Sequence, residues 1–168
     1  YAPFEHAQTD STEFPLHALT QRPPFMYHAW GSQNAWLRQI MARNFLYLHP
    51  DTAARYGLAD GDWAELRSHL SAITVPVKLT NNVQPDTVWT WNALGKRKRT
   101  WGLSADAPES NQGFLLNPLI SDLTPNADYA NADPITGQAA WFDLRVALRK
   151  VAPQSFSTPQ FTPLGAMA

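Results

Sequence analysis

Two neighbouring segments of alternating side chains, residues 63–69 and 73–79, constrain the fold of this chain more than any other feature. In the second segment, apolar Ile and Val alternate with Thr, Pro and Lys. Successive side chains of a β-strand point to opposite faces of the sheet, so a two-residue period indicates a half-buried strand. Because only a short turn separates the segments, the sequence predicts a β-hairpin, with Pro76 at a sheet edge or a bulge.

Further short strand candidates recur along the chain, and helical segments are few and brief. The other expected strands are residues 14–20, 45–49, 87–92 and 141–151. Pro23-Pro24 ends the first of them, because proline cannot continue a hydrogen-bonded ladder. Many short strands with two or three short helices are typical of a closed β-barrel with helical insertions. The sequence therefore predicts a mainly β fold.

A helix is predicted between the first two strands. Ser32 is placed to cap it, and it would run over residues 33–42. Trp36, Leu37, Ile40 and Met41 share one face at helical spacing, so we expect that face to be buried.

A second, brief helix is predicted to start at Pro50, a residue that suits the first helical position. Gly57 is placed to end it in the left-handed conformation. Asp60 and Asp62 flank a glycine just beyond, so a turn explains them better than an acid–base pair.

The composition excludes several classes of function. The chain has 168 residues, a net charge of −1 and 16% charged residues. A general nucleic-acid-binding domain is normally strongly basic, so this charge argues against one. Since the chain has no cysteine, it has no disulfide, no thiolate metal site and no iron–sulfur cluster of its own. Low charge together with seven Trp indicates a surface that other protein or a ligand covers.

The two ends of the chain carry no strand or helix pattern. Residues 1–13 are polar and unpatterned, which predicts a connecting arm, and residues 152–168 are rich in Pro, Ser, Thr and Gln, which predicts a tail. The chain begins at Tyr1 and shows neither a leader pattern nor a run of about 18 apolar residues. We therefore expect a soluble part of a longer polypeptide, with a barrel over residues 14–151.

The segment from Leu19 to Ser32 is the main candidate for ligand binding. A strand stops abruptly there, and a loop with hydrogen-bond donors leads into the expected helix. Arg22 offers a planar fork of donors, and Thr20 and Ser32 offer hydroxyl groups. With the free N–H groups of a helix start, such a loop can hold phosphate groups. A surface arginine and simple helix capping by Ser32 explain the same residues without a ligand.

Several motifs, in this order and spacing, resemble one known family. They are Leu19-Thr20-Gln21-Arg22, Trp36-Leu37, His49-Pro50-Asp51-Thr52-Ala53-Ala54, Gly57-Leu58-Ala59-Asp60-Gly61-Asp62, Gln84-Pro85-Asp86, Asn117-Pro118-Leu119 and Asp133-Pro134-Ile135-Thr136-Gly137-Gln138. Residues 14–151 are thereby similar to the C-terminal molybdopterin-dinucleotide-binding domain of the dimethyl-sulfoxide-reductase family. The resemblance implies a six-stranded double-psi β-barrel that is not itself catalytic and that covers a much larger catalytic subunit.

The resemblance also implies a cofactor and its contacts. The family binds molybdopterin guanine dinucleotide that carries molybdenum, or sometimes tungsten, and the protein ligand of the metal lies in another domain. The positions that match cofactor contacts of the family are Thr20, Arg22, His28, Ser32, Asn117 and Gln138. Asn117 lies within an apolar run, so we expect its amide to be buried and paired. The chain departs from the family at Gln21, where many members have glycine, and at Phe142, where many have lysine.

The family further implies protein partners. They are the remainder of the catalytic large subunit, together with an iron–sulfur electron-transfer subunit, and also a quinone-linked membrane subunit. A cytoplasmic location, with any membrane attachment made through partner subunits, is favoured over a periplasmic one. Residues 117–141 most resemble members that handle formate, sulfite or related sulfur compounds, and the sequence does not choose among these substrates.

Two other functions stay open. Pyruvoyl-dependent decarboxylases of the same barrel type cleave themselves at a Gly-Ser bond, and Gly31-Ser32 is such a dipeptide. The second alternative is a non-enzymatic double-psi adaptor domain of the kind found on some ATPases, although the chain has no Walker-type phosphate loop.

Two further groups of residues are ambiguous. Residues 96–99 form a run of four like charges, which is either a solvated loop or an attractor for anions. Trp89, Trp91 and Trp101 are expected in the core, in contacts with other domains or in the wall of a substrate funnel.

Overall fold

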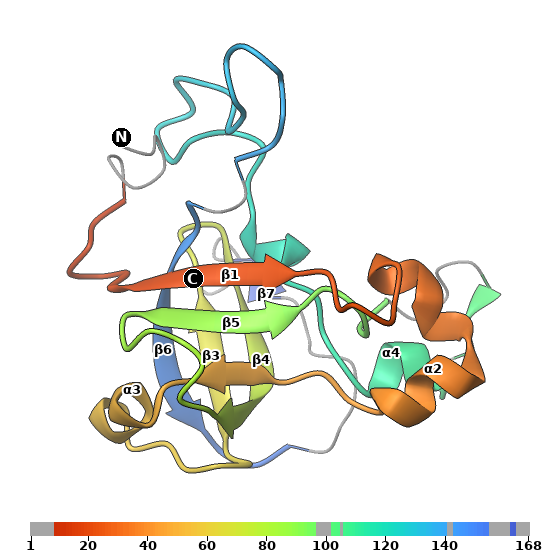
Figure 1. Cartoon of the computed structure of the whole chain (residues 1–168). Helices are drawn as coiled ribbons and strands as arrows, with labels where there is room; N and C mark the ends of the chain where they lie inside the picture. The colour runs from red at the N-terminus through yellow and green to blue at the C-terminus, as the bar shows by residue number, and fades with distance from the viewer. Residues whose placement is uncertain (1–8, 97–101, 105, 141–142, 155–161, 164–168) are drawn as a thin grey trace.

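Six strands close into a β-barrel (Figure 1). The computed structural model describes residues 9–96, 102–104, 106–140, 143–154 and 162–163. The barrel strands are β1 (Leu16–Gln21), β2 (Leu46–Leu48), β3 (Trp63–Arg67), β4 (Ser71–Leu79), β5 (Thr87–Trp91) and β6 (Arg145–Val151). They pair in the order β2-β5-β1-β6-β3-β4, and the pairing of β2 with β4 closes the ring. A further short strand, β7 (Thr162–Pro163), pairs with β4.

Two pairs of neighbouring strands run parallel. β1 is parallel to β5, with Leu19 opposite Trp89, and β2 is parallel to β4. The other pairings within the barrel are antiparallel. The mainly β, six-stranded double-psi barrel with short helical insertions that the sequence predicts is thus confirmed. Because parallel strands share a direction, the loops that follow β1 and β5 leave the barrel at the same end.

The predicted hairpin is confirmed as β3 and β4, and Pro76 lies at no bulge but where one side of β4 is locally a sheet edge. It pairs with Trp63 within the continuous β3–β4 register. The backbone N–H of Val77 donates to the carbonyl of Asp62 on the β3 side (2.8 Å), so the proline nitrogen faces the other side. There, among the described residues, β4 pairs at 71–72 and 77–79 and leaves 73–76 unpaired. The missing N–H group of Pro76 therefore leaves no ladder bond unmade.

Alternate residues of the strands fill the barrel with apolar side chains. Those with no more than 2% exposure include Leu16, Leu46, Leu48, Leu66, Val75, Val77, Val88 and Val146. On β1 and β5 this alternation buries Ala18 and Val88 and turns Leu19 and Trp89 outward. The two strands thus have an inner face toward the core and an outer face.

The region predicted as one helix over residues 33–42 is divided. The structure has a 3₁₀ helix, η1 (His28–Gln33), followed by α2 (Ala35–Ile40). Asn34, and not Ser32, caps α2, because its Oδ1 accepts hydrogen bonds from the N–H groups two and three residues on (2.9 and 3.4 Å). Serine and asparagine are about equally good caps, so the sequence pattern could not choose between them.

The predicted buried face of this helix is only partly buried. Met41 packs into a small second apolar cluster with Met26 and Leu94. Trp36 and Ile40, expected on the same buried face, are 76% and 65% exposed. Six residues make less than two turns, too short a helix to bury a continuous stripe of side chains.

The second predicted helix is confirmed as α3 (Pro50–Arg55), and Gly57 beyond it has a φ of +63°. The turn at Asp60 and Gly61 is confirmed, and Asp62 accepts from the N–H of Ala59 within it (2.7 Å). Asp60 accepts from the N–H of Leu79 (2.7 Å) and so joins the turn to the end of β4. Two more short helices, α4 (Pro108–Asn111) and η3 (Asn117–Leu119), lie in the connection between β5 and β6.

Parts of several predicted features lie outside the described residues. They are residues 1–8 of the expected arm, most of the expected tail, residues 97–101 with Trp101, and Phe142. Within the described ranges, no helix is long and apolar enough to cross a membrane. The same ranges contain no group of three or more His, Cys, Asp or Glu side chains placed to hold a metal ion.

Candidate functional site

The loops after β1 and β5 start at the same end of the barrel, where η1, α2 and α4 gather (Figure 1). The backbone N–H of Asn92 donates to the carbonyl of Gln21 (3.0 Å), so the two strands stay joined up to their carboxyl ends. Buried Met26, Ala93 and Leu94 share one apolar cluster, which holds the two loops together. This end of the barrel is the candidate functional site.

Asn44 fixes the inner wall of the site. It is fully buried, and its Nδ2 donates to the carbonyls of Trp91 (2.7 Å) and Phe114 (3.0 Å). Its Oδ1 accepts from the N–H of Phe45 (3.1 Å) and lies 3.2 Å from the hydroxyl of Thr90. One side chain thus ties three separate chain segments. Asn44 is absent from the residues predicted for the site, because nothing near it in the sequence marks its distant partners.

Thr20 is a predicted contact residue, and its hydroxyl is left unsatisfied by the protein. Thr20 follows Ala18 on the inner face of β1, and its Oγ1 is buried with no hydrogen-bond partner among the described residues. Opposite it on β5, Thr90 does have a partner and donates to the carbonyl of Phe45 (2.9 Å). A buried hydroxyl without a partner costs free energy, so this oxygen is suited to bind a ligand group.

Arg22 and His28, two other predicted contacts, are exposed on the loop that follows β1. Both contact the ring of Tyr27. The Arg22 Cζ is 6.0 Å from the centroid of that ring, and the centroids of the His28 and Tyr27 rings lie 5.2 Å apart in an edge-on arrangement. His28 has a positive φ of 50°, a conformation uncommon outside glycine. The loop therefore presents a guanidinium and an imidazole to its surroundings.

Ser32, unlike the exposed Arg22 and His28, is enclosed by the protein. It is fully buried in η1, and its Oγ donates to the carbonyl of Ala29 (2.5 Å). Its own carbonyl accepts from Arg38 (2.7 Å), which also lies 3.7 Å from Glu109 of α4. Ser32 therefore holds η1 to α2, and a direct contact with a cofactor stays a prediction.

Asn117 and Gln138 belong to a different region. The expectation that Asn117 is a buried amide is wrong, since the residue is exposed at the start of η3 and its backbone forms the turn. Gln138 is exposed too, in the segment 121–140, which rises away from the barrel and from α2 in Figure 1. The structure therefore places Arg22 and His28 on one ring of the loop that follows Thr20, while Gln138 lies in a separate segment.

The loop that carries Gln138 is shaped by its own turn residues. The carboxylate of Asp133 accepts from the N–H groups of Ile135 (2.9 Å) and Thr136 (2.7 Å), and these bonds lower the pKa of Asp133. Gly137 then takes a φ of +73°, which favours glycine. The loop is thus internally ordered.

Lys96 is a buried cation near the site. Only 8% exposed, it lies next to Glu109, and its backbone N–H donates to the carbonyl of that residue (3.1 Å). Burial lowers the pKa of Lys96, and the charge of Glu109 opposes this shift. The solvated-loop interpretation is therefore wrong for Lys96, and the rest of the basic run lies outside the described residues.

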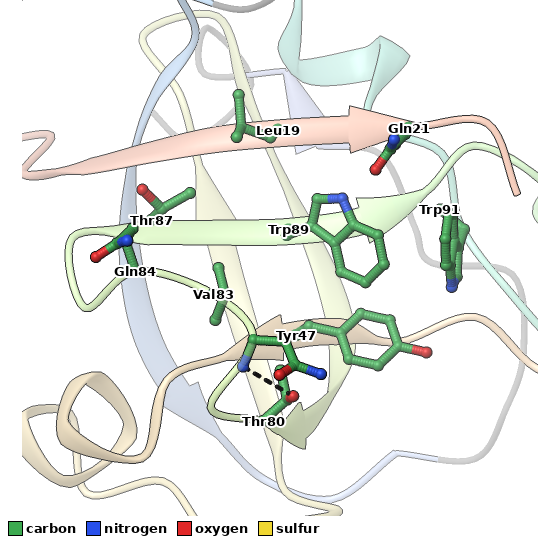
Figure 2. A pocket seen from close by; sticks show the side chains of 10 residues that line it. Leu19, Gln21, Tyr47, Thr80, Val83, Gln84, Thr87, Trp89 and Trp91 are labelled. Atoms are coloured by element: carbon green, nitrogen blue, oxygen red, sulfur yellow. Dashed lines mark hydrogen bonds between the residues drawn. The ribbon is translucent and has the colours of Figure 1, made fainter.

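An aromatic groove lies on the outer face of β1, β5 and β2 (Figure 2). Its volume is about 520 Å³, and its walls include Leu19, Gln21, Tyr47, Thr80, Val83, Gln84, Trp89 and Trp91. The centroid of the Trp89 ring lies 4.8 Å from that of the Tyr47 ring and 4.4 Å from that of the Trp91 ring. Both tryptophans are only partly buried, so they lie at the surface of this domain and not in its core.

The fold and the polar loop define a class of cofactor-binding barrel, and comparison with known proteins identifies it. The family described as "Molydopterin dinucleotide binding domain" matches residues 16–135. The match starts at β1 and contains the whole loop from Thr20 to Ser32. This chain belongs to the molybdopterin-dinucleotide-binding domain family, and its function is to bind that cofactor.

Relatives and a solved structure agree with this assignment. One subunit of the sulfite dehydrogenase from Allochromatium vinosum is 46% identical over 98% of this chain and 18% of its own length. Dopamine dehydroxylase of Eggerthella lenta is 27% identical over 88% of this chain and 14% of its own length. The structure of acetylene hydratase from Pelobacter acetylenicus shares the fold, with a TM-score of 0.59 and 20% identity over 84% of this chain and 19% of that one. The chain spans less than a fifth of each of these proteins.

Because the chain belongs to this family, neither the decarboxylase nor the adaptor function is supported. None of these three relatives is a pyruvoyl-dependent decarboxylase or an ATPase adaptor. The Gly31-Ser32 dipeptide is explained by packing, since a Cβ added to Gly31 would lie 3.3 Å from Met26, and Ser32 is buried.

Proposed function

We propose that this chain holds a guanine dinucleotide form of the molybdopterin cofactor within a larger molybdenum or tungsten oxidoreductase. The observation that carries the proposal is the buried hydroxyl of Thr20, which has no partner among the described residues, followed two residues later by the exposed Arg22. Both residues lie within the part of the chain that the family matches. A pyrophosphate offers acceptor oxygens that suit both a hydroxyl and a guanidinium.

The residues of the site fit such a group. Arg22 offers its fork of N–H donors to a phosphate, and Thr20 donates from the end of β1. Asn44 and the cluster around Met26 fix the loops beforehand, so little order is lost on binding. When bound, the cofactor supplies redox chemistry at its metal, while the residues of this chain bind and orient its nucleotide. Because the chain has no cysteine, a thiolate ligand for the metal would have to come from elsewhere.

The test is Arg22→Ala in the full-length enzyme. Loss of one charged hydrogen-bonding partner should lower the retained metal and guanine nucleotide about tenfold. Both contents are measured on the purified protein, by metal analysis and by chromatography of the released nucleotide. Arg149→Ala is the matched control, since Arg149 is an exposed β6 residue paired only with Glu65 (3.0 Å) among the contacts described. Unchanged contents in Arg22→Ala would contradict the role of Arg22.

We further propose sulfite as the substrate of the whole enzyme. The support is the 46% identity to the sulfite dehydrogenase sequence over almost the whole chain. An iron–sulfur subunit, a quinone-linked membrane subunit, and a cytoplasmic location belong to the same proposal. The full-length enzyme should reduce an artificial electron acceptor with sulfite and not with formate, and the reverse preference would reject sulfite.

A further inference from the structure

Three polar side chains form a row on the inner face of the site. Thr20 lies on β1, Thr90 lies opposite it on β5, and Asn92 follows two residues later. Residues two apart on an extended chain share a face, while Trp91 between them turns outward into the groove. The protein satisfies only one of these three side chains among the residues that the structure describes.

Thr90 shows that the fold supplies partners where a polar group is enclosed. It is fully buried, its hydroxyl donates to the carbonyl of Phe45 (2.9 Å), and Asn44 Oδ1 lies 3.2 Å away. The Nδ2 of the Asn44 amide binds two other carbonyls. The fold therefore does satisfy the enclosed polar groups that lie next to Thr20 and Asn92.

Asn92 has a fixed backbone and an unsatisfied side chain. Its N–H donates to the carbonyl of Gln21 (3.0 Å), and Ala93 and Leu94 after it are fully buried. Its Oδ1 is buried and has no partner within the described ranges. A carbonyl oxygen only accepts hydrogen bonds, so an ionised phosphate, which also only accepts, cannot satisfy it. The group that completes this site must carry an N–H or O–H donor.

We propose that Asn92 is a further cofactor-binding residue, whose Oδ1 accepts a hydrogen bond from an N–H of a 2-amino-4-oxopyrimidine ring. Pterin and guanine both contain this ring and both present N–H donors along its edge. The inference rests on the proposed function, because it requires the cofactor at the carboxyl ends of β1 and β5. Asn92 then binds a ring of the cofactor, while Arg22 and Thr20 bind its phosphates.

The first test is Asn92→Leu in the full-length enzyme. The change removes the acceptor and keeps the branched shape of the side chain, so the retained pterin and metal should fall about tenfold, the equivalent of one hydrogen bond. In the cofactor-free protein the same variant should unfold at the same or a higher temperature, because it removes an unpaired buried carbonyl. An asparagine with a purely structural role would lower both the cofactor content and the unfolding temperature.

Two further variants make the test specific. Asn92→Asp keeps an acceptor oxygen in place and should retain more cofactor than Asn92→Leu, and it serves as the test variant if the leucine protein does not fold. Asn81→Leu changes an exposed asparagine of the turn after β4 and should leave both measurements unchanged.

A titration of the cofactor-free enzyme with GDP distinguishes the two rings. Weaker GDP binding by Asn92→Leu assigns the contact to guanine, while unchanged GDP binding with lowered pterin content assigns it to pterin. Wild-type cofactor content together with wild-type GDP binding in Asn92→Leu would overturn the inference and leave the proposed function standing. A wild-type enzyme that purifies without pterin under molybdate-replete expression would overturn both.

Discussion

The two ends of β1 treat buried polar groups in opposite ways. At the amino end, the guanidinium of buried Arg145 donates to the carbonyls of Phe14 (2.8 Å) and Pro15 (2.9 Å) and lies 3.3 Å from His17 Nε2. At the carboxyl end, the hydroxyl of Thr20 has no partner among the described residues. The same strand therefore has one end that the protein completes by itself and one end that it leaves incomplete.

This difference separates structural from ligand-binding polar residues. Burying a charge is costly unless hydrogen bonds surround it, so the arrangement around Arg145 is what stability requires. An unpaired hydroxyl contributes nothing to the stability of the free domain, and a ligand can recover the lost bond. We therefore expect a substitution at the amino end to lower mainly the stability. A substitution at the carboxyl end should lower mainly the retention of the cofactor.

The largest effect is expected at the completed end. Arg145→Met leaves the carbonyls of Phe14 and Pro15 without their donor and should lower the free energy of unfolding by about 3 kcal/mol. Denaturant titration of the purified enzyme measures this loss. Enzyme that remains folded should keep its cofactor. A stability loss below about 1 kcal/mol would show that the two ends do not differ as we describe.

An intermediate effect is expected at the carboxyl end of β1, where only the retention of the cofactor should change. Thr20→Val keeps the β-branched shape and removes the hydroxyl, so the cofactor-free protein should be as stable as the wild type or slightly more stable. Cofactor retention, followed as the metal lost during dialysis, should weaken about threefold to tenfold. Destabilisation of the cofactor-free protein would mean that the hydroxyl has a partner within the folded domain.

The smallest effect is expected away from both ends, at the turn after α3. The Nζ of Lys150 lies 2.6 Å from Asp62, and this bond, with the N–H of Ala59, lowers the pKa of the Asp62 carboxyl. A lowered pKa contributes stability above the ordinary pKa of aspartate, and this stability is lost as the pH falls through the folded-state value. Wild type should therefore exceed Asp62→Asn in unfolding temperature slightly at neutral pH and converge with it in strong acid. A difference that persists in acid would exclude this ion pair as its source.

Much of the fold could be predicted because its signals are local. The hairpin of β3 and β4 follows from side-chain alternation and a short turn, and the positive φ of Gly57 follows from its place after a helix. The prediction of Ser32 as the cap of α2 is wrong, since Asn34 is an equally good cap two residues away. The prediction of a buried Trp36 is wrong as well, because periodicity does not show whether a neighbour covers a helix face.

The location of the candidate site and its cofactor contacts stay predictions, and the structure shows how the predicted residues are placed. The order of motifs predicts a cofactor-binding loop between Leu19 and Ser32, and the family match covers that segment. The motifs did not show that Ser32 is enclosed within η1, or that Gln138 lies on a separate loop. These facts depend on how the connections pack outside the barrel.

The sequence by itself determined the strand pattern, the barrel class, the turn aspartates and the family, because short-range periodicity and ordered motifs encode them. Only the tertiary structure decided which polar atoms are satisfied. Asn44 finds its partners 46 to 70 residues away, at Thr90, Trp91 and Phe114. Asn92 and Thr20 find none for their buried oxygens in the part of the chain that the structure describes. Hydrogen bonding in an interior depends on which distant segments the barrel brings together, and no local pattern records that.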